Sequence, residues 1–587
     1  MLLRLLLLCL LPLPLFAQPS STDWMTPFET QANTTATYAE TIAFYQKLAA
    51  AFPQFEVQEY GSTDSGHPLH LAILSTDRDF DPISLRAKNK TILMVNNAIH
   101  PGEPCGIDAT MLLLRDYLSD PQKLALLNRT VLIVIPFYNI GGGLNRNGYS
   151  RVNQNGPQAY GFRGNARNLD LNRDFVKCDT RNAQTFNQIY GRWQPDVLID
   201  NHTSNGADYQ YTMTLIPTHP DKLAPALAEQ LEAELLPALY DGMRKRDWEM
   251  IPYVYARESP DQGIAGFLDL PRYSSGYAAL FHSLSFMPET HMLKPFADRV
   301  RSTQAFMECM IEYLAERGDA VRAARQRARA ESLAEQTVAL HWEIDQGAVD
   351  QVLFKGYAAK YRKSTVSGLD RLYYDREAPY EKEIPYYNTY RAKLEVARPL
   401  AYILPQAYAE VAERLRWNGV VLRQLAEDVE VEVELYRIGD FKTGNGPYEG
   451  HYLHSEVEVE KSLRKWSYRA GDYVIYTQQS GVDRYLIQTL EPQAPDSWFA
   501  WNFFDGILNQ KEYFSAYVFE DLAAEYLDRD PELRRALEAQ RAADPEFAAS
   551  ARAQLQFVYE RSPHYESTHR IYPVGRLMED QALPLED

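Results

Sequence analysis

Residues 91–115 contain a short apolar run, a turn and a helical pattern in that order, and this order constrains the fold more than any other feature of the chain. The run at residues 92–95 is continuously apolar, as in a strand that is buried on both faces. Prolines and a glycine then form a turn that carries His100 and Glu103, and an apolar pattern of helical period follows. A histidine and a carboxylate so placed can supply two of the three protein ligands of a catalytic zinc site, although an isolated HxxE pair also occurs by chance.

Three further apolar runs follow along the chain, and a helical pattern around residues 222–244 separates the last two. They cover residues 130–137, 195–201 and 283–287, and the last two lead to His202 and Glu289. Strands that alternate with helices indicate an α/β fold, and ligands of such sheets gather at the carboxyl ends of the strands. We therefore expect a mixed central sheet with helices on both faces, and a metal site at one edge of it.

The segment at residues 138–175 predicts a long surface loop that is rich in Asn, Gly and Arg. Loops of this length are uncommon in compact domains and are often functional. This one carries Arg146, Arg151, Arg163, Arg167 and Arg173 among few acidic residues. It therefore predicts either a positive pocket for an anionic group or a set of solvated and structural arginines.

The chain has 587 residues, which is more than one hydrophobic core accommodates. The α/β pattern extends over residues 22–340. Short alternating runs such as VEVEVELYRI then predict a smaller β-rich domain at residues 345–520. The highly charged end of the chain, residues 521–587, predicts a helical segment.

Residues 1–17 carry one basic residue, a leucine-rich stretch and a small residue at the end, which is the form of a secretory signal peptide. The apolar run is shorter than the roughly 20 residues that span a bilayer, and Pro12 and Pro14 interrupt it. We expect this segment to be cleaved. The protein is then exported to the periplasm or the extracellular space, with no stable membrane span.

The formal net charge is −19 at pH 7, and this acidity disfavours a nucleic-acid partner because phosphate binding depends on basic patches. Removal of residues 1–17 leaves Cys105, Cys178 and Cys309. Three cysteines cannot form a complete set of internal disulfides, so the chain is not a disulfide-built scaffold, and whether one pair is oxidised stays open.

Taken together, HPGE at residues 100–103, LDLNRDF at residues 169–175, His202 and Glu289 resemble the zinc carboxypeptidase (M14) family of metallopeptidases. The resemblance covers roughly residues 38–310, and it depends on the order and spacing of these pieces. It implies a carboxypeptidase-like α/β fold with one Zn²⁺ per chain, bound by His100, Glu103 and His202. Three protein ligands leave a fourth position for water, as a catalytic zinc ion requires.

The resemblance also implies how a peptide is bound and cleaved. Glu289 matches the glutamate that takes a proton from the zinc-bound water and passes it to the leaving amine. Asn172 and Arg173 match the pair that binds the free terminal carboxylate of the substrate. A guanidinium suits that task because it can bind both carboxylate oxygens at once.

Two further roles have more than one candidate in this sequence. Arg151, in SRVN, is the best local match to the arginine that polarises the scissile carbonyl, with Arg163 and Arg167 as alternatives. Tyr273, in YSSG, is our choice for the tyrosine that closes over the substrate, and Tyr277 is the second choice.

Two departures from the family pattern indicate a divergent, bacterial-type exported subgroup with an extra C-terminal domain. Many members have an arginine inside the zinc motif, where Pro101 and Gly102 stand here. The Asn-Pro-Asp-Gly segment of the family is replaced by NIGG at residues 139–142.

Three hypotheses for function follow. The leading one is a zinc-dependent metallocarboxypeptidase that acts on peptides or proteins with a free C-terminus. The second is a zinc amidase or deacylase that acts on cell-wall peptides or N-acyl amino acids. The third is a non-catalytic peptide-binding protein.

Overall fold

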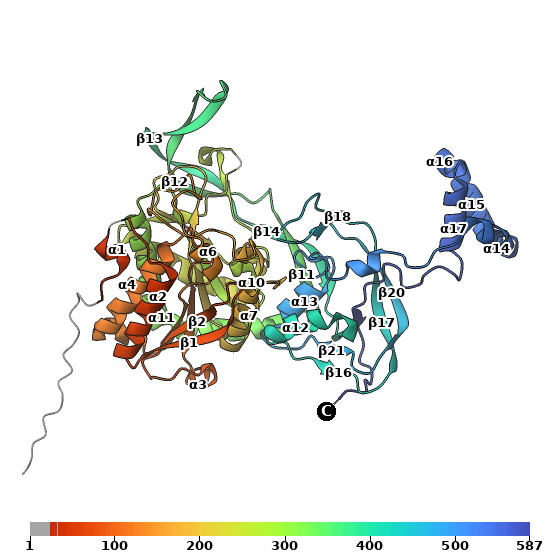
Figure 1. Ribbon diagram of the computed structural model, residues 1–587, viewed down its shortest axis with the longest axis horizontal. Coiled ribbons are helices and arrows are strands. Elements are labelled where there is room, and N and C mark those ends of the chain that lie inside the picture. Colours follow the sequence, from red (N-terminus) through yellow and green to blue (C-terminus); the bar gives the residue numbers. More distant parts are fainter. Residues whose placement is uncertain (1–23, 32, 257, 587) are drawn as a thin grey trace, which may run out of the picture.

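The computed structural model describes residues 24–31, 33–256 and 258–586, so the predicted signal peptide lies outside the described residues. Figure 1 shows an α/β body, a β-rich body beside it, and a group of short helices set apart from both. We refer to the described residues up to 334 as the N-terminal region and to those from 337 onward as the C-terminal region.

The N-terminal region is built on one mixed sheet. Its strands follow the order β1-β2-β4-β3-β5-β10-β7-β8, and β6 pairs with β10. The bounds of these strands are β1 (Phe55–Ser62), β2 (Pro68–Leu74), β3 (Thr91–Asn96), β4 (Thr130–Ile135), β5 (Val197–Asp200), β6 (His202–Ser204), β7 (Met213–Pro217), β8 (Met250–Pro252) and β10 (Leu284–His291).

The central strands of this sheet run in one direction. β3 is parallel to β4 and β5, and β5 is parallel to β10, whereas β1, β2 and β4 pair antiparallel. The carboxyl ends of β3, β5 and β10 therefore meet at one edge of the sheet. β10 is longer than the run at residues 283–287 predicted, because it continues alongside β6 and β7, and Glu289 thus lies within the strand.

Helices cover both faces of the sheet, as the sequence predicted. Successive residues of β3 belong to different cores: Leu93 and Val95 pack on one face and Ile92 and Met94 on the other. The first face is covered by α2 (Tyr38–Ala51), α4 (Cys105–Ser119), α8 (Pro225–Glu229), α9 (Leu236–Arg244) and α11 (Phe296–Ala334). The second is covered by α7 (Arg181–Trp193) and α10 (Ser274–Ala279), and by α12 (Ala409–Trp417) and α13 (Asp483–Leu490) of the C-terminal region. One core thus runs from the central sheet into the C-terminal region.

A second sheet organises the C-terminal region. Its strand order is β16-β21-β15-β22-β17-β20. The bounds are β15 (Ala401–Leu404), β16 (Arg423–Gln424), β17 (Val429–Ile438), β20 (Val459–Tyr468), β21 (Tyr473–Tyr476) and β22 (Gly575–Leu577). β22 lies between β15 and β17, so the last strand of the chain is an inner strand of this sheet.

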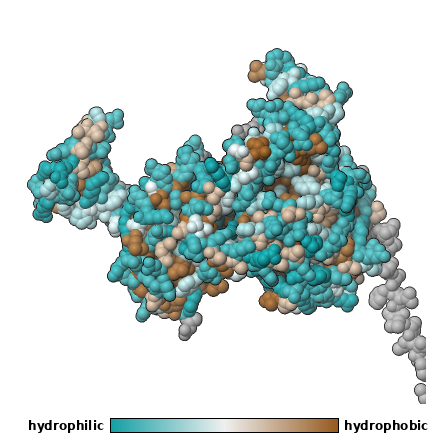
Figure 2. Space-filling view, turned by 180° about the vertical axis from the view of Figure 1, so that it is seen from behind, coloured by the Kyte–Doolittle hydropathy of each residue, from teal (hydrophilic) through white to brown (hydrophobic). Residues whose placement is uncertain are grey.

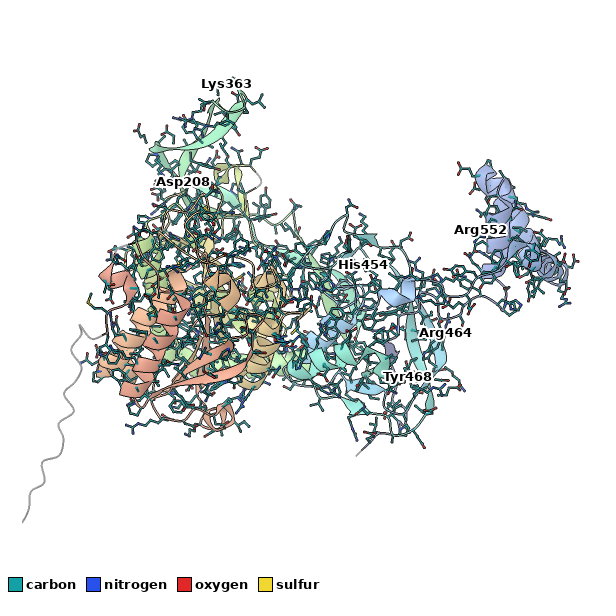
Figure 3. The ribbon with its side chains drawn as sticks, viewed as in Figure 1. Asp208, Lys363, His454, Arg464, Tyr468 and Arg552 are labelled. Carbon is teal, nitrogen blue, oxygen red and sulfur yellow. The ribbon has the colours of Figure 1, made fainter. Side chains whose placement is uncertain are left out.

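Two pairs of strands precede this sheet. β11 (Thr337–Ile344) pairs with β14 (Tyr390–Ala397), and between them β12 (Asp350–Lys363) and β13 (Asp370–Tyr387) form a long hairpin. The hairpin projects from the N-terminal region (Figure 1), with Asp208 near its base and Lys363 toward its far end (Figure 3). Arg376 Nε donates to Asp208 Oδ2 at 2.6 Å and helps to hold the base in place.

The separate helical group contains α14 (Ala516–Arg529), α15 (Pro531–Ala543), α16 (Pro545–Ala548) and α17 (Ala551–Glu560), and it has a small core of its own. Seen from behind in Figure 2, it stands apart from the main surface. The helices end at Glu560 instead of continuing to residue 587, because the chain returns to form β22. Among the described residues, no helix combines the length and apolarity needed to cross a bilayer. Cys105, Cys178 and Cys309 are buried and free.

Candidate active site

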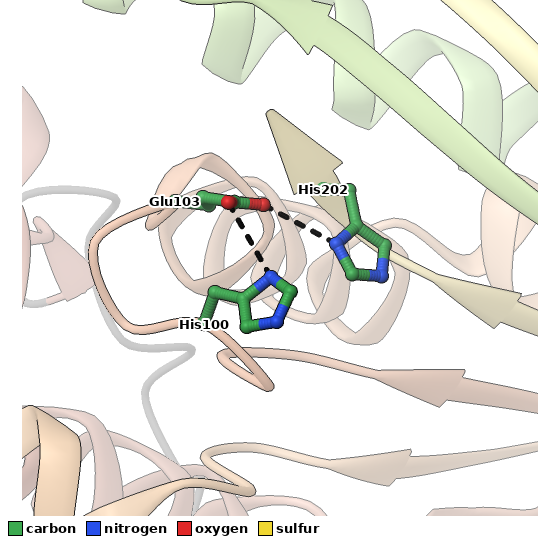
Figure 4. Close-up of side chains that lie close together, drawn as sticks. All are labelled: His100, Glu103 and His202. Carbon is green, nitrogen blue, oxygen red and sulfur yellow. Dashed lines mark hydrogen bonds and ion pairs between the residues drawn. The ribbon is translucent and has the colours of Figure 1, made fainter. Parts of the chain in front are cut away.

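His100, Glu103 and His202 converge at the carboxyl edge of the central sheet (Figure 4). Glu103 contacts both rings: its Oε1 is 3.3 Å from Nδ1 of His100, and its Oε2 is 3.2 Å from Nδ1 of His202. The three side chains are almost fully buried, and the ligand atoms that they offer lie within 4.8 Å of one another. This is the predicted set of metal ligands, brought together from a turn and a neighbouring strand.

Both histidines are oriented by a second carboxylate. Asp170 Oδ1 lies 2.9 Å from Nε2 of His100, and Asp200 Oδ2 lies 3.0 Å from Nε2 of His202. Each ring therefore presents Nδ1 to Glu103. A histidine whose outer nitrogen bonds a carboxylate is the usual form of a metal ligand, because the carboxylate fixes the tautomer and raises the basicity of the ring. Two nitrogens and one carboxylate oxygen in this arrangement fit a zinc ion and leave a position for water.

The state of Glu103 supports the same assignment. Burial alone would raise the pKa of its carboxyl, but the charges of His100 and Arg151 outweigh burial and hold that pKa well below its usual range. Glu103 is therefore a carboxylate at neutral pH, as a metal ligand must be.

The turn between β3 and α4 explains how His100 and Glu103 reach the same point. The N–H of Glu103 donates to the carbonyl of His100 at 2.8 Å, which closes a tight turn before α4 begins. Gly102 in this turn has no room for a side chain, because a Cβ there would lie 2.7 Å from Cδ of Arg151 and 3.0 Å from the carbonyl oxygen of Gly161. Where many family members carry an arginine, this chain has a glycine over which Arg151 packs.

Two of the three candidate arginines lie at the metal ligands. Arg151 Nη1 donates to Glu103 Oε1 at 2.9 Å. Arg163 Nη1 lies 3.3 Å from the same oxygen, and its Nε donates to Asp170 Oδ2 at 2.9 Å. Arg167 does not join them, since its Nη1 donates to the carbonyl of Asp179.

A cavity of about 580 Å³ opens beside the metal ligands. Glu289 lies in its wall, in register with His202 across the β10–β6 pair, and burial raises the pKa of its carboxyl to about 7 against the opposing effect of His202. The predicted site residues that line the cavity are His100, Glu103, Arg151, Arg163, Asn172, Arg173, His202, Tyr273 and Glu289. Arg167 and Tyr277 are not among them.

Arg173 and Tyr273 form one wall of this cavity. The guanidinium carbon of Arg173 lies 4.5 Å from the centre of the Tyr273 ring, in a cation–π arrangement. Tyr277 is fully buried, and its hydroxyl donates to Asn418 Oδ1 of the C-terminal region. It therefore faces the core instead of the cavity.

Several residues of the site were not singled out from the sequence. Asp200 precedes His202 by two positions in a strand, and an Asp-x-His pattern there would have been a usable signal. Asp170 lies inside the LDLNRDF segment without having been assigned a role. Four apolar and aromatic side chains of the cavity wall come from separate elements and share no motif: Ile216, Tyr253, Phe267 and Met287.

Comparisons with known proteins agree with this site. The family model for zinc carboxypeptidase matches residues 41–210, which include the three metal ligands but not Glu289. Carboxypeptidase 2 of Trichophyton equinum is 23% identical over 433 residues, which cover 70% of this chain and 74% of that protein. Carboxypeptidase 2 of Trichophyton rubrum is 23% identical over 440 residues, with the same coverage of 70% and 74%.

Two solved structures are also similar to this chain. A metallo-carboxypeptidase from Pseudomonas aeruginosa, in complex with (2-guanidinoethylmercapto)succinic acid, is 18% identical and covers 49% of this chain and 70% of its own, with a TM-score of 0.37. Carboxypeptidase A from Helicoverpa armigera is 17% identical and covers 51% of this chain and 75% of its own, with a TM-score of 0.35.

The family match and the carboxypeptidases among its relatives indicate a metallopeptidase, and the buried His-Glu-His set at the edge of the α/β sheet agrees with that class. These findings support the resemblance to the zinc carboxypeptidase family that was seen in the sequence, and the family match itself extends over residues 41–210.

Proposed function

We propose that this protein is an exported zinc carboxypeptidase that removes C-terminal residues from peptides, with one zinc ion per chain. One observation carries the proposal: a single cavity joins the metal ligands, the buried carboxyl of Glu289, and the Asn172–Arg173 pair. A cleavage site and a carboxylate-binding site so close together suit hydrolysis of the last peptide bond of a chain.

The residues of the cavity have separate roles in this proposal. When bound by His100, Glu103 and His202, zinc would supply Lewis acidity toward water and the scissile carbonyl. Arg173 binds the terminal carboxylate of the peptide and thereby fixes which bond lies beside Glu289. The Glu289 carboxylate accepts a proton from the attacking water and then donates it to the departing amine nitrogen.

Asn172, Arg151 and Tyr273 have supporting roles in this proposal. Asn172 Oδ1 accepts a hydrogen bond from the N–H of Ser274 at 3.2 Å, which leaves its amide group to join Arg173 at the carboxylate. Arg151 lies beside the metal ligands, where its charge can stabilise the oxygen of the scissile carbonyl as negative charge develops on it. Tyr273 covers the Arg173 side of the cavity.

The cavity wall favours an apolar C-terminal residue. Ile216, Phe267 and Met287 present apolar surface there, and the carboxylates among the described lining residues are Glu103 and Glu289, both already assigned to the reaction. A basic side chain would find no free counter-charge among these lining groups, and burial of an unpaired charge is costly. We therefore infer a preference for aliphatic or aromatic C-terminal residues.

The proposal also covers export and the division of the chain into domains. We infer export from the signal-peptide form of residues 1–17. We assign the catalytic domain to residues 22–340, an accessory β-rich domain to residues 345–520, and a further segment to residues 521–587.

The test is to incubate the purified protein with a peptide mixture, with and without a chelator, and to read the trimmed ends by mass spectrometry. We expect loss of single C-terminal residues that stops when the metal is removed. Equal cleavage of peptides whose C-terminus is blocked as an amide would favour the amidase alternative. Binding without cleavage by the metal-loaded protein would favour the non-catalytic one.

A further inference from the structure

A turn of the C-terminal region, Tyr448–His451, lies against the loop of the N-terminal region that carries Asp170 and Arg173. The turn is closed by two backbone hydrogen bonds between Tyr448 and His451, of 2.7 and 3.1 Å. Glu449 and Gly450 both have positive φ, of 51° and 87°, and a glycine adopts that conformation without strain. The backbone of the turn therefore has a defined shape.

Three of the four residues in this turn bond to the loop. Tyr448 accepts a hydrogen bond at its hydroxyl from Arg173 Nε, at 2.9 Å. Glu449 Oε2 accepts from the backbone N–H of Asp170 at 2.7 Å. His451 Nε2 lies 2.7 Å from Oδ2 of Asp179. The two segments are far apart in the sequence, so the contact exists only when both regions are folded and docked.

Tyr448 is itself held from behind. Its ring stacks on that of Trp501, with 6.1 Å between the ring centres and 14° between the planes, and Trp501 is fully buried. Arg272 lies over both rings and pairs with Asp496 at 2.8 Å. The ring that carries the hydroxyl facing Arg173 is thus held by a stack on a buried tryptophan and by an arginine above it.

The guanidinium of Arg173 is consequently fixed from two sides. The Tyr273 ring covers one face, and the Tyr448 hydroxyl holds Nε, while Nη1 donates to the carbonyl of Asn172 at 2.8 Å. In the described part of the chain, no protein acceptor bonds Nη2. An arginine held in this way loses little rotamer freedom when it binds an anion.

We propose that the Tyr448–His451 turn is a positioning element for the carboxylate-binding group of the active site, so that the C-terminal region takes part in substrate recognition. This inference rests on the proposed function, in which Arg173 binds the terminal carboxylate. Tyr448 does not line the cavity and acts through Arg173. Glu449 acts through Asp170, whose carboxyl also orients His100.

The main test is Tyr448→Phe, which keeps the ring stack and removes the hydroxyl. We expect KM for peptides with a free C-terminus to rise about fivefold to tenfold, with kcat within about twofold, because a hydrogen bond to a charged group is lost. Tyr452→Phe is the matched control: Tyr452 is in the same loop, the residue is 53% exposed, and its backbone bonds Asn502. It should leave both constants unchanged.

A second pair of variants separates positioning from folding. Glu449→Ala removes the acceptor for the Asp170 N–H and should raise KM, whereas Glu449→Gln keeps an acceptor oxygen and should restore most of the wild-type value. If KM is unchanged in both Tyr448→Phe and Glu449→Ala, the inference is wrong.

Binding can also be measured without turnover, in a Glu289→Gln background, by titrating one peptide in its free-acid and C-terminal amide forms. We expect Tyr448→Phe to weaken the free-acid form about fivefold to tenfold and to leave the amide form unchanged. Equal weakening of both forms would overturn the inference. If wild-type protein cleaves no peptide, the proposed function fails, yet this titration still shows whether the turn positions Arg173.

Discussion

Asp200 Oδ2 lies 3.0 Å from Nε2 of His202, and this contact leaves Nδ1 of the same ring free to bind a metal. Asn96 Nδ2 holds the other carboxylate oxygen of Asp200 at 3.0 Å. Asn96 and Asp200 are partners across the parallel β3–β5 pair. The orientation of one ligand is thus fixed by the register of the central sheet.

Asp200→Asn should therefore weaken zinc binding by about tenfold to a hundredfold, because a neutral amide is a poorer acceptor for the histidine N–H. The measurement is the zinc dissociation constant by competition with a coloured chelator. Asp375→Asn, in the projecting hairpin, is the control and should bind zinc as the wild type does. An unchanged constant in Asp200→Asn would show that this carboxylate does not support the ligand.

Glu289→Gln should lower kcat by about a hundredfold to ten thousandfold, since the amide can neither accept nor return a proton. Bound zinc, measured by elemental analysis, should stay at the wild-type level because Glu289 is not a ligand. Full activity with zinc bound would falsify the assigned role.

Peptides that differ only in their last residue test the inferred side-chain preference. A peptide that ends in leucine should have a kcat/KM about a hundredfold higher than one that ends in lysine, because the ammonium group finds no counter-charge in the apolar wall. The variant Ile216→Asp supplies a counter-charge, and it should reduce or reverse the difference in kcat/KM between the two peptides. Equal cleavage of both peptides by the wild type would contradict the preference.

Gly102→Ala tests the close packing of Arg151 over the zinc motif. The added Cβ would lie 2.7 Å from Cδ of Arg151. The Arg151 side chain must therefore shift, and we expect its contact with Glu103 to be weakened. We expect a loss of about 1–3 kcal/mol in stability and of about tenfold or more in kcat/KM. Gly506→Ala is the control, since a Cβ there meets nothing within 4 Å. Equal activity and melting temperature in the two variants would contradict the packing argument.

Asp108, in α4, predicts a pH dependence of stability that is separate from catalysis. Burial raises the pKa of its carboxyl to about 7, although hydrogen bonds from Thr35 and Ala36 oppose the shift. Since this pKa is higher in the folded state than in the unfolded state, its contribution to stability is complete at acidic pH and is lost as pH rises through about 7. The shift of about three units corresponds to at most about 4 kcal/mol.

Asp108→Asn removes the titration and keeps a side chain that can bond to Thr35 and Ala36. The melting temperature of the wild type minus that of this variant should therefore decrease as the pH rises from 5 to 8. Titrations of other groups are common to both proteins and cancel in this difference. A difference that stays constant over this range would exclude a raised pKa at Asp108.

Much of the central sheet could be predicted because its strands are short, apolar and bounded by clear turns. The same pattern placed His100, His202 and Glu289 near the carboxyl ends of strands, where the parallel arrangement brings distant segments together. Chemistry that depends on local motifs and strand order is therefore visible in the sequence.

Contacts between the two regions could not be predicted in the same way. No pattern relates Tyr448 to Arg173, because their contact depends on how two separately patterned regions dock. The choice between Tyr273 and Tyr277 also depended on docking, since Asn418 of the C-terminal region holds the hydroxyl of Tyr277 in the core. Neither spacing nor periodicity carries that information.

The place of β22 inside the second sheet has a consequence for the order of assembly. Strands β15 and β17 are made long before β22, yet β22 lies between them. A chain that leaves the ribosome, or crosses a membrane, with its N-terminus first cannot close this sheet until residues 575–577 have emerged. The central sheet can form earlier, because all of its strands precede residue 292. Strand β22 thus delays completion of the second sheet, and of the region that carries the Tyr448–His451 turn, relative to the sheet that carries the metal ligands.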